Sequence, residues 1–136
     1  MGSSSMTEEI AKWLKKANGD YLSMKKLVRS SETYDNACFH AQQCIEKLLK
    51  AYLLGKGIDF PFFHDLTRLS DLIDPKNPRL EALWKDFELL SQYAVGIRYP
   101  DDSATKEDAR DAMKSCQKCR EILLEELGLQ QNLFSA

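Results

Sequence analysis

The spacing of apolar residues constrains the fold of this chain more than any other feature. They recur at steps of three and four residues through four long segments, as on the buried face of a helix. No stretch shows the sustained two-residue alternation of a half-buried strand. Proline and glycine, which interrupt helices, are few and gather between these segments. The chain is therefore predicted to be all-α.

The breaks divide the chain into four substantial helices and one short helix. Thr7 can cap the first helix, and Thr105 followed by Asp108 has the spacing of a capping box at the start of the last. Gly55 and Gly57 provide the stop after the second helix. We expect an up-and-down four-helix bundle with one additional short helix, over the ranges 7–28, 33–54, 64–73, 78–98 and 105–128.

The fourth of these ranges is expected to be one continuous helix. It starts near Pro78 and ends at Arg98, because Tyr99-Pro100 cannot continue it. Its predicted inner face consists of Leu80, Leu83, Trp84, Phe87, Leu90, Ala94 and Ile97.

Length and charge limit the class of protein. The 136 residues are enough for one domain, which we place at 6–128, after a vector-derived leader at 1–5 and before a polar, disordered tail at 129–136. The net charge of −2 argues against a broadly basic nucleic-acid binder. No apolar run approaches the length that spans a membrane, and no signal peptide is visible, so we expect a cytoplasmic protein without a membrane segment.

The four cysteines are predicted to be packed thiols. Cys116 and Cys119 have the spacing of half a zinc site, but they fall in the middle of a helix rather than in a knuckle loop. Cys116 lies within the apolar stripe of that helix, and free cysteine is among the most buried residue types. We therefore expect no metal site and no cofactor.

The two histidines and a nearby lysine are candidate binding residues. His40, Gln43 and Lys47 are three and four residues apart and share a polar strip beside the apolar face of the second helix. This strip is either a solvated helix flank or a row of donors that meets phosphate or a protein partner. His64 opens the short helix next to Asp65, where it either anchors the loop or takes part in chemistry.

Arg98 is the most informative single residue. It ends the apolar stripe of the fourth range, and a guanidinium there needs partners or a wet cleft because unpaired buried charge is costly. It either forms a structural pair with Asp101 or a backbone carbonyl, or lies in a cleft that a phosphate or a partner carboxylate can reach. Arg120 lies inside the apolar stripe of the last helix, where it snorkels or faces a second subunit.

No glycine-rich phosphate loop, carboxylate-pair signature or nucleophile elbow is present. The chemistry of the residues alone therefore predicts a helical binding domain with a cleft for an anionic ligand.

Three segments together resemble the HEPN family (higher eukaryotes and prokaryotes nucleotide-binding). Residues 37–53, ACFHAQQCIEKLLKAYL, are similar to the signature helix of that family. The family follows this helix with a glycine-rich turn, a His-Asp-Leu step and an Arg-Tyr-Pro step. These match Gly55-Lys56-Gly57, His64-Asp65-Leu66 and Arg98-Tyr99-Pro100, in order, over nearly all of residues 7–128.

The resemblance implies an all-α bundle that commonly dimerises, with a cleft between subunits. Many members are encoded beside a minimal nucleotidyltransferase, or fused to one, often as toxin–antitoxin pairs. A large branch are metal-independent ribonucleases, which use an arginine, four to six intervening residues and a histidine. With Arg98 as the arginine, that histidine belongs at 103, 104 or 105, which here are Ser103, Ala104 and Thr105.

The leading hypothesis is a non-catalytic HEPN protein: a homodimeric helical module that partners a nucleotidyltransferase and binds nucleotide or RNA phosphate in a cleft near Arg98. In this hypothesis His40, Lys47 and His64 support the ligand. The alternative is a metal-independent endoribonuclease, the toxin of a toxin–antitoxin pair, which uses Arg98 with a displaced histidine. The missing histidine favours a protein that is not an enzyme.

Overall fold

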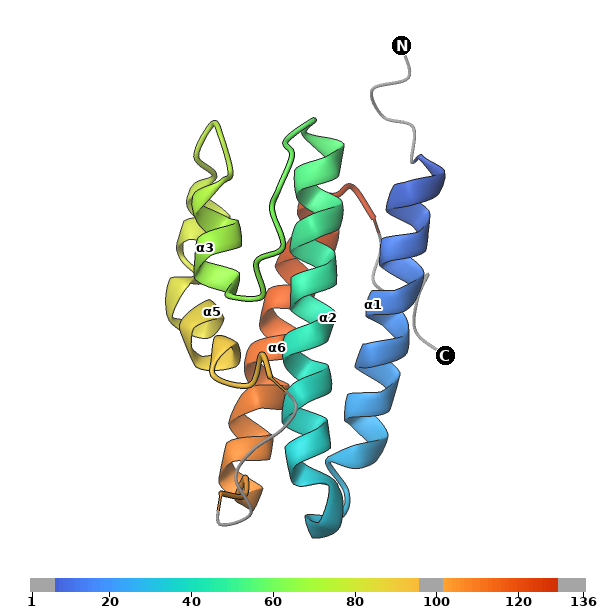
Figure 1. The fold of residues 1–136 in the computed structure, drawn as a ribbon, viewed down its shortest axis with the longest axis vertical. Helices are drawn as coiled ribbons and strands as arrows, with labels where there is room; N and C mark the ends of the chain where they lie inside the picture. Colours follow the sequence, from blue (N-terminus) through green and yellow to red (C-terminus); the bar gives the residue numbers. More distant parts are fainter. Residues whose placement is uncertain (1–6, 96–101, 130–136) are drawn as a thin grey trace.

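The computed structural model describes residues 7–95 and 102–129, and these residues form helices without any strand (Figure 1). The prediction of an all-α bundle is confirmed. Most of the predicted leader and tail, and Arg98 with its neighbours, lie outside the described residues. The elements are α1 (Glu8–Leu27), the 3-10 helix η1 (Ser31–Thr33), α2 (Tyr34–Gly55), α3 (Leu66–Asp71), α4 (Pro78–Glu81), α5 (Trp84–Ser91) and α6 (Lys106–Glu126).

Helix α2 forms the centre of the bundle (Figure 1). It runs antiparallel to α1 and also packs against α6, α3 and α5. A helix with neighbours on several sides needs apolar residues around most of its circumference. The sequence of α2 meets this need, since its fully buried apolar side chains are Cys38, Ala41, Cys44, Ile45, Leu49, Ala51 and Leu53.

The helix boundaries follow the signals in the sequence. The Thr7 hydroxyl accepts a hydrogen bond from the Ile10 backbone at 3.1 Å, so it caps α1 as expected. Thr105 and Asp108 form the predicted capping box at the start of α6, with bonds of 3.0 and 2.9 Å. Gly57 follows α2 with φ of 72°, a left-handed conformation that glycine adopts without steric cost.

The fourth range differs from the prediction, because two short helices replace one long helix. A turn at Ala82–Leu83 separates α4 from α5, and the helix ends at Ser91. At one end, Asn77 Nδ2 donates to Glu126 at 2.7 Å, which ties the start of α4 to the end of α6. The change of direction lets α5 pack against the middle of α6, and these tertiary contacts outweigh the local preference for a continuous helix.

The break also changes which side chains face the core. Leu80, Leu83, Phe87 and Leu90 are buried as predicted, but Trp84 is 41% exposed. Beyond the end of α5, Tyr93 is buried in place of Ala94, which is only half-buried. The predicted register therefore holds through Leu90 apart from Trp84, and it fails for Tyr93 and Ala94 because α5 ends at Ser91.

All four cysteines are buried and none forms a disulfide. A hydrogen bond with Cys44 and burial raise the pKa of the Cys116 thiol well above its ordinary value. Burial likewise raises the pKa of the Cys119 thiol. Both side chains are therefore neutral packing groups at neutral pH. Within the described ranges, none of the helices is long and apolar enough to cross a membrane.

Candidate functional site

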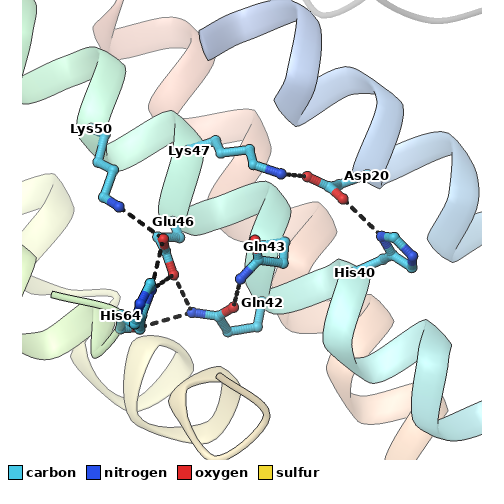
Figure 2. A network of polar contacts seen from close by, with 8 residues as sticks. All are labelled: Asp20, His40, Gln42, Gln43, Glu46, Lys47, Lys50 and His64. Atoms are coloured by element: carbon cyan, nitrogen blue, oxygen red, sulfur yellow. Dashed lines mark hydrogen bonds and ion pairs between the residues drawn. The ribbon is translucent and has the colours of Figure 1, made fainter. Parts of the chain in front are cut away.

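Two clusters of polar side chains, most of them buried or half-buried, lie along α2 (Figure 2). One cluster joins α2 to α1, and the other joins α2 to the loop before α3. Three of the four predicted site residues lie in these clusters, and the fourth, Arg98, lies outside the described residues. The cluster residues are Asp20, His40, Gln42, Gln43, Glu46, Lys47, Lys50 and His64.

Asp20 organises the cluster between α1 and α2, which we call the Asp20 cluster. One carboxylate oxygen contacts His40 Nδ1 at 2.7 Å, and the other accepts from Lys47 Nζ. Asp20 is buried, whereas the side chains of His40 and Lys47 are 29% and 19% exposed. The structure thus brings His40 and Lys47 together, because both contact the Asp20 carboxylate. That carboxylate offsets the positive charge of Lys47.

Glu46 organises the second cluster, which we call the Glu46 cluster. Its carboxylate accepts from Lys50 Nζ at 2.9 Å and from Gln42 Nε2 at 3.0 Å, and it lies 3.2 Å from His64 Nδ1. Gln42, Glu46 and Lys50 are all buried, but the His64 side chain is 61% exposed. Gln42 also donates to the backbone oxygen of His64 at 2.8 Å, so the loop is held by both backbone and side chain.

The Glu46 carboxyl is ionised at neutral pH in spite of its burial. Desolvation raises its pKa, but hydrogen bonds from Lys50, Gln42 and His64 outweigh that effect and bring the pKa below its ordinary value of 4.5. A buried carboxylate that accepts from the Nδ1 of an imidazole fixes the ring and leaves Nε2 directed away from it.

The free energy of unfolding is expected to fall as the pH is lowered below about 4.5, because the unfolded chain binds a proton at Glu46 more readily than the folded chain. This contribution is present in full above the unfolded-state pKa and disappears as the pH falls through the folded-state value. Urea denaturation at a series of pH values between about pH 7 and about pH 3 measures this change in the free energy of unfolding. Glu46→Gln removes the titrating group and is the control. An equally steep fall in that variant would assign the effect to other carboxyls, such as Glu126.

Arg120 is buried inside the bundle and neither snorkels nor faces outward. It is 4% exposed, and its guanidinium carbon lies 4.0 Å from the centre of the Tyr21 ring. This cation–π contact connects α6 to α1 within one protomer.

The stretch where the ribonuclease histidine was expected has a structural role. The Ala104 side chain is buried, and its backbone nitrogen donates to Asp35 Oδ1 at 2.6 Å. Thr105 caps α6. These contacts attach the residues just before α6 to Asp35, at the start of α2.

Sequence reasoning missed Asp20 and Glu46, the two carboxylates around which the site residues gather. Asp20 belongs to the first helix and its partners to the second, so no local spacing connects them. Glu46 and Lys50 do have the four-residue spacing of a helical ion pair, which was a usable signal. Their burial could not be predicted from the sequence, because it depends on the loop that packs over them.

Comparisons with known proteins agree with the all-α fold. Residues 10–127 match the HEPN domain family. The protein named "Putative toxin MJ1304" from Methanocaldococcus jannaschii is 29% identical over 139 residues, which cover 88% of this chain and 91% of that protein. The crystal structure of TT1696 from Thermus thermophilus superposes with a TM-score of 0.75 at 26% identity, over 88% of this chain and 99% of that one. The structure of ST0689, an archaeal HEPN homologue, shares the fold at 21% identity with a TM-score of 0.69, over 87% of this chain and 97% of that one.

Proposed function

Because this chain belongs to the HEPN domain family, we propose that it is a non-catalytic member that binds nucleotide or RNA phosphate and partners a nucleotidyltransferase. It acts as a homodimer, and Arg98 contacts the phosphate. His64 supports the ligand, whereas His40 and Lys47 lie together on Asp20, away from His64. The contacts of Ala104 and Thr105 and the pairing of Lys47 and Lys50 with carboxylates support this proposal.

The observation that carries the proposal is that Ala104 and Thr105, two of the three positions where the histidine was expected, make structural contacts. The ribonucleases that this sequence resembles need a histidine there to move protons. Here Thr105 is occupied in capping α6, and Ala104 is buried with its amide bonded to Asp35. The segment is therefore built to join two helices rather than to present an imidazole.

The remaining histidines are arranged for separate structural contacts. His40 and His64 lie on opposite sides of α2, and each contacts a different buried carboxylate through Nδ1 (Figure 2). Cleavage of RNA through the 2′-hydroxyl needs a base and an acid that converge on one phosphodiester. Two imidazoles held on different elements by different carboxylates do not form such a pair.

The charges of the α2 face are balanced internally, which fits a local ligand contact. Asp20 offsets Lys47, and Glu46 offsets Lys50. A face without net positive charge attracts the backbone of nucleic acid only weakly. In this proposal Arg98 therefore makes a local phosphate contact, and the charge-balanced surface around Asp20 and Lys47 is suited to a protein partner.

The decisive experiment is an RNA cleavage assay with the purified protein in the presence of a chelator. We expect no cleavage of a fluorescent single-stranded RNA, and weaker binding of that RNA by Arg98→Ala. The proposal predicts a nucleotidyltransferase gene next to the gene for this protein, and co-expression of the two proteins is then expected to yield a stable complex on size-exclusion chromatography. Metal-free cleavage that disappears in Arg98→Ala would overturn the non-catalytic proposal.

A second candidate, a metal-independent ribonuclease toxin, is favoured by one specific arrangement. The Glu46 carboxylate orients the exposed His64 ring, as an orienting carboxylate does for a general base. The Leu66 amide donates to Ser91 Oγ at 2.9 Å, which places His64 beside the end of α5, seven residues before Arg98 in the sequence. The relative from Methanocaldococcus jannaschii, named as a toxin, fits the same candidate. In this case His64→Ala abolishes cleavage and growth arrest, while His40→Ala retains both.

A further inference from the structure

The loop between α2 and α3 exposes one phenylalanine almost completely. Phe62 is 95% exposed, whereas Phe60 packs edge-on against Trp13 with ring centres 6.4 Å apart. Phe63 is half-buried and lies under the Arg68 guanidinium. Two of the three phenylalanine rings in this loop therefore have partners within the chain, and only Phe62 presents its faces to solvent.

The backbone around Phe62 forms a local turn, and it is attached to α2 two residues after Phe62. The Phe63 nitrogen donates to the Pro61 oxygen at 2.8 Å, and Gln42 donates to the His64 oxygen at 2.8 Å. The Glu46 carboxylate also contacts His64 Nδ1, at 3.2 Å, and so orients the His64 ring. A ring on a fixed loop loses little conformational freedom when a ligand stacks on it.

Two donors for phosphate lie within six residues of this ring. The Arg68 guanidinium carbon is 3.8 Å from the centre of the Phe63 ring, so the side chain is positioned by stacking. Within residues 7–95 and 102–129, no carboxylate forms an ion pair with Arg68. The neighbouring Asp65 carboxylate instead accepts from the Thr67 amide and hydroxyl, at 2.9 and 2.6 Å. The exposed His64 ring adds a second donor.

We propose that residues 62–68 form a nucleotide-binding surface on which a base of single-stranded RNA stacks against Phe62 while Arg68, assisted by His64, binds the adjacent phosphate. This inference rests on the proposed function and gives the base a contact of its own, separate from Arg98. Aromatic rings and guanidinium groups are the side chains that bind unpaired nucleotides, since every base has a face to stack and every phosphate accepts hydrogen bonds.

A nucleotide fits this surface better than a protein partner does. Protein interfaces have a contiguous apolar centre surrounded by a polar rim. Phe62 instead projects alone, between the exposed residues Pro61 and His64, with Asp59 exposed nearby. A single ring is sufficient for one base, but it does not provide the apolar centre that a stable protein interface needs.

The test compares two fluorescein-labelled probes in titrations followed by fluorescence anisotropy: a ten-nucleotide oligoadenylate, and an abasic strand with the same number of phosphates. Phe62→Ala is expected to weaken binding of oligoadenylate by about 5- to 100-fold and to leave the abasic strand unaffected, because only stacking is lost. Arg68→Met is expected to weaken binding of both probes and to reduce the dependence on salt.

Two variants serve as matched controls. Trp84→Ala removes another exposed aromatic ring from α5, and Arg110→Met removes an exposed arginine from α6. Both are expected to bind the two probes like the wild type, and thermal melting verifies that every variant is folded.

The possible failures are distinguishable. If the wild type binds oligoadenylate and Phe62→Ala behaves like Trp84→Ala, the loop is not the base contact, while the proposed function stands. If the wild type binds neither probe, both the proposed nucleotide function and this inference are wrong. If Phe62→Ala retains oligoadenylate binding but loses the complex with the nucleotidyltransferase, the ring contacts protein and the inference is overturned.

Discussion

Replacing Glu46 with alanine is expected to lower the free energy of unfolding by about 3–5 kcal/mol, because the change leaves the Lys50 ammonium buried without its partner. Glu46 and Lys50 are 4% and 5% exposed, and the Lys50 nitrogen also lies 5.4 Å from the Trp13 ring centre. In that position water does not readily replace the lost carboxylate. The same change removes the acceptor of Gln42 and the carboxylate that holds the His64 ring.

Urea denaturation monitored by circular dichroism at neutral pH measures this effect, and two further variants separate its causes. Glu125→Ala breaks the exposed ion pair with Arg79, and about 1 kcal/mol or less is expected there. The double variant Glu46→Leu with Lys50→Leu removes both charges and is expected to recover most of the lost stability. A loss below about 1 kcal/mol for Glu46→Ala would show that Lys50 is not dependent on this carboxylate.

Replacing Phe87 with alanine is expected to lower the free energy of unfolding by a similar amount, about 3–5 kcal/mol. Phe87 is fully buried on α5, a helix of eight residues that needs its tertiary contacts with α2, α3 and α6 to be stable. The substitution removes buried apolar contact area and leaves a cavity in the core. The midpoint of urea denaturation measures the loss.

Phe62→Ala is the matched control for Phe87→Ala, since it is the same substitution at a ring that is 95% exposed. Its expected effect on stability lies within about 0.5 kcal/mol. A comparable loss in both variants would indicate that Phe62 is covered in solution. A negligible loss for Phe87→Ala would mean that α5 contributes little to the cooperative fold.

Most of the helical framework could be predicted from the sequence, for a local reason. A helix with one buried face repeats its apolar residues every three or four positions, and the caps at Thr7 and Thr105 are formed by residues within three positions of each other. Such signals depend on neighbours in the chain. They can therefore be recognised without knowing what packs against the helix.

The candidate site was only partly predictable. His40, Lys47 and His64 were identified as chemically able residues, but their partners Asp20 and Glu46 were not. Each of these carboxylates acquires its role from a second element, α1 in one case and the loop before α3 in the other. Tertiary structure also decided that the two histidines lie apart, on opposite sides of α2 (Figure 2).

The sequence by itself determined that this chain is an all-α domain and resembles the HEPN family, because both follow from periodicity and from the order of local motifs. Only the tertiary structure decided where the fourth helical range breaks, which carboxylates offset Lys47 and Lys50, and that Phe62 alone among the phenylalanines of its loop faces solvent. These features depend on which elements meet in space. Burial and pairing change the energy of a charge or a ring by several kcal/mol, whereas local propensity contributes less than about 1 kcal/mol per residue.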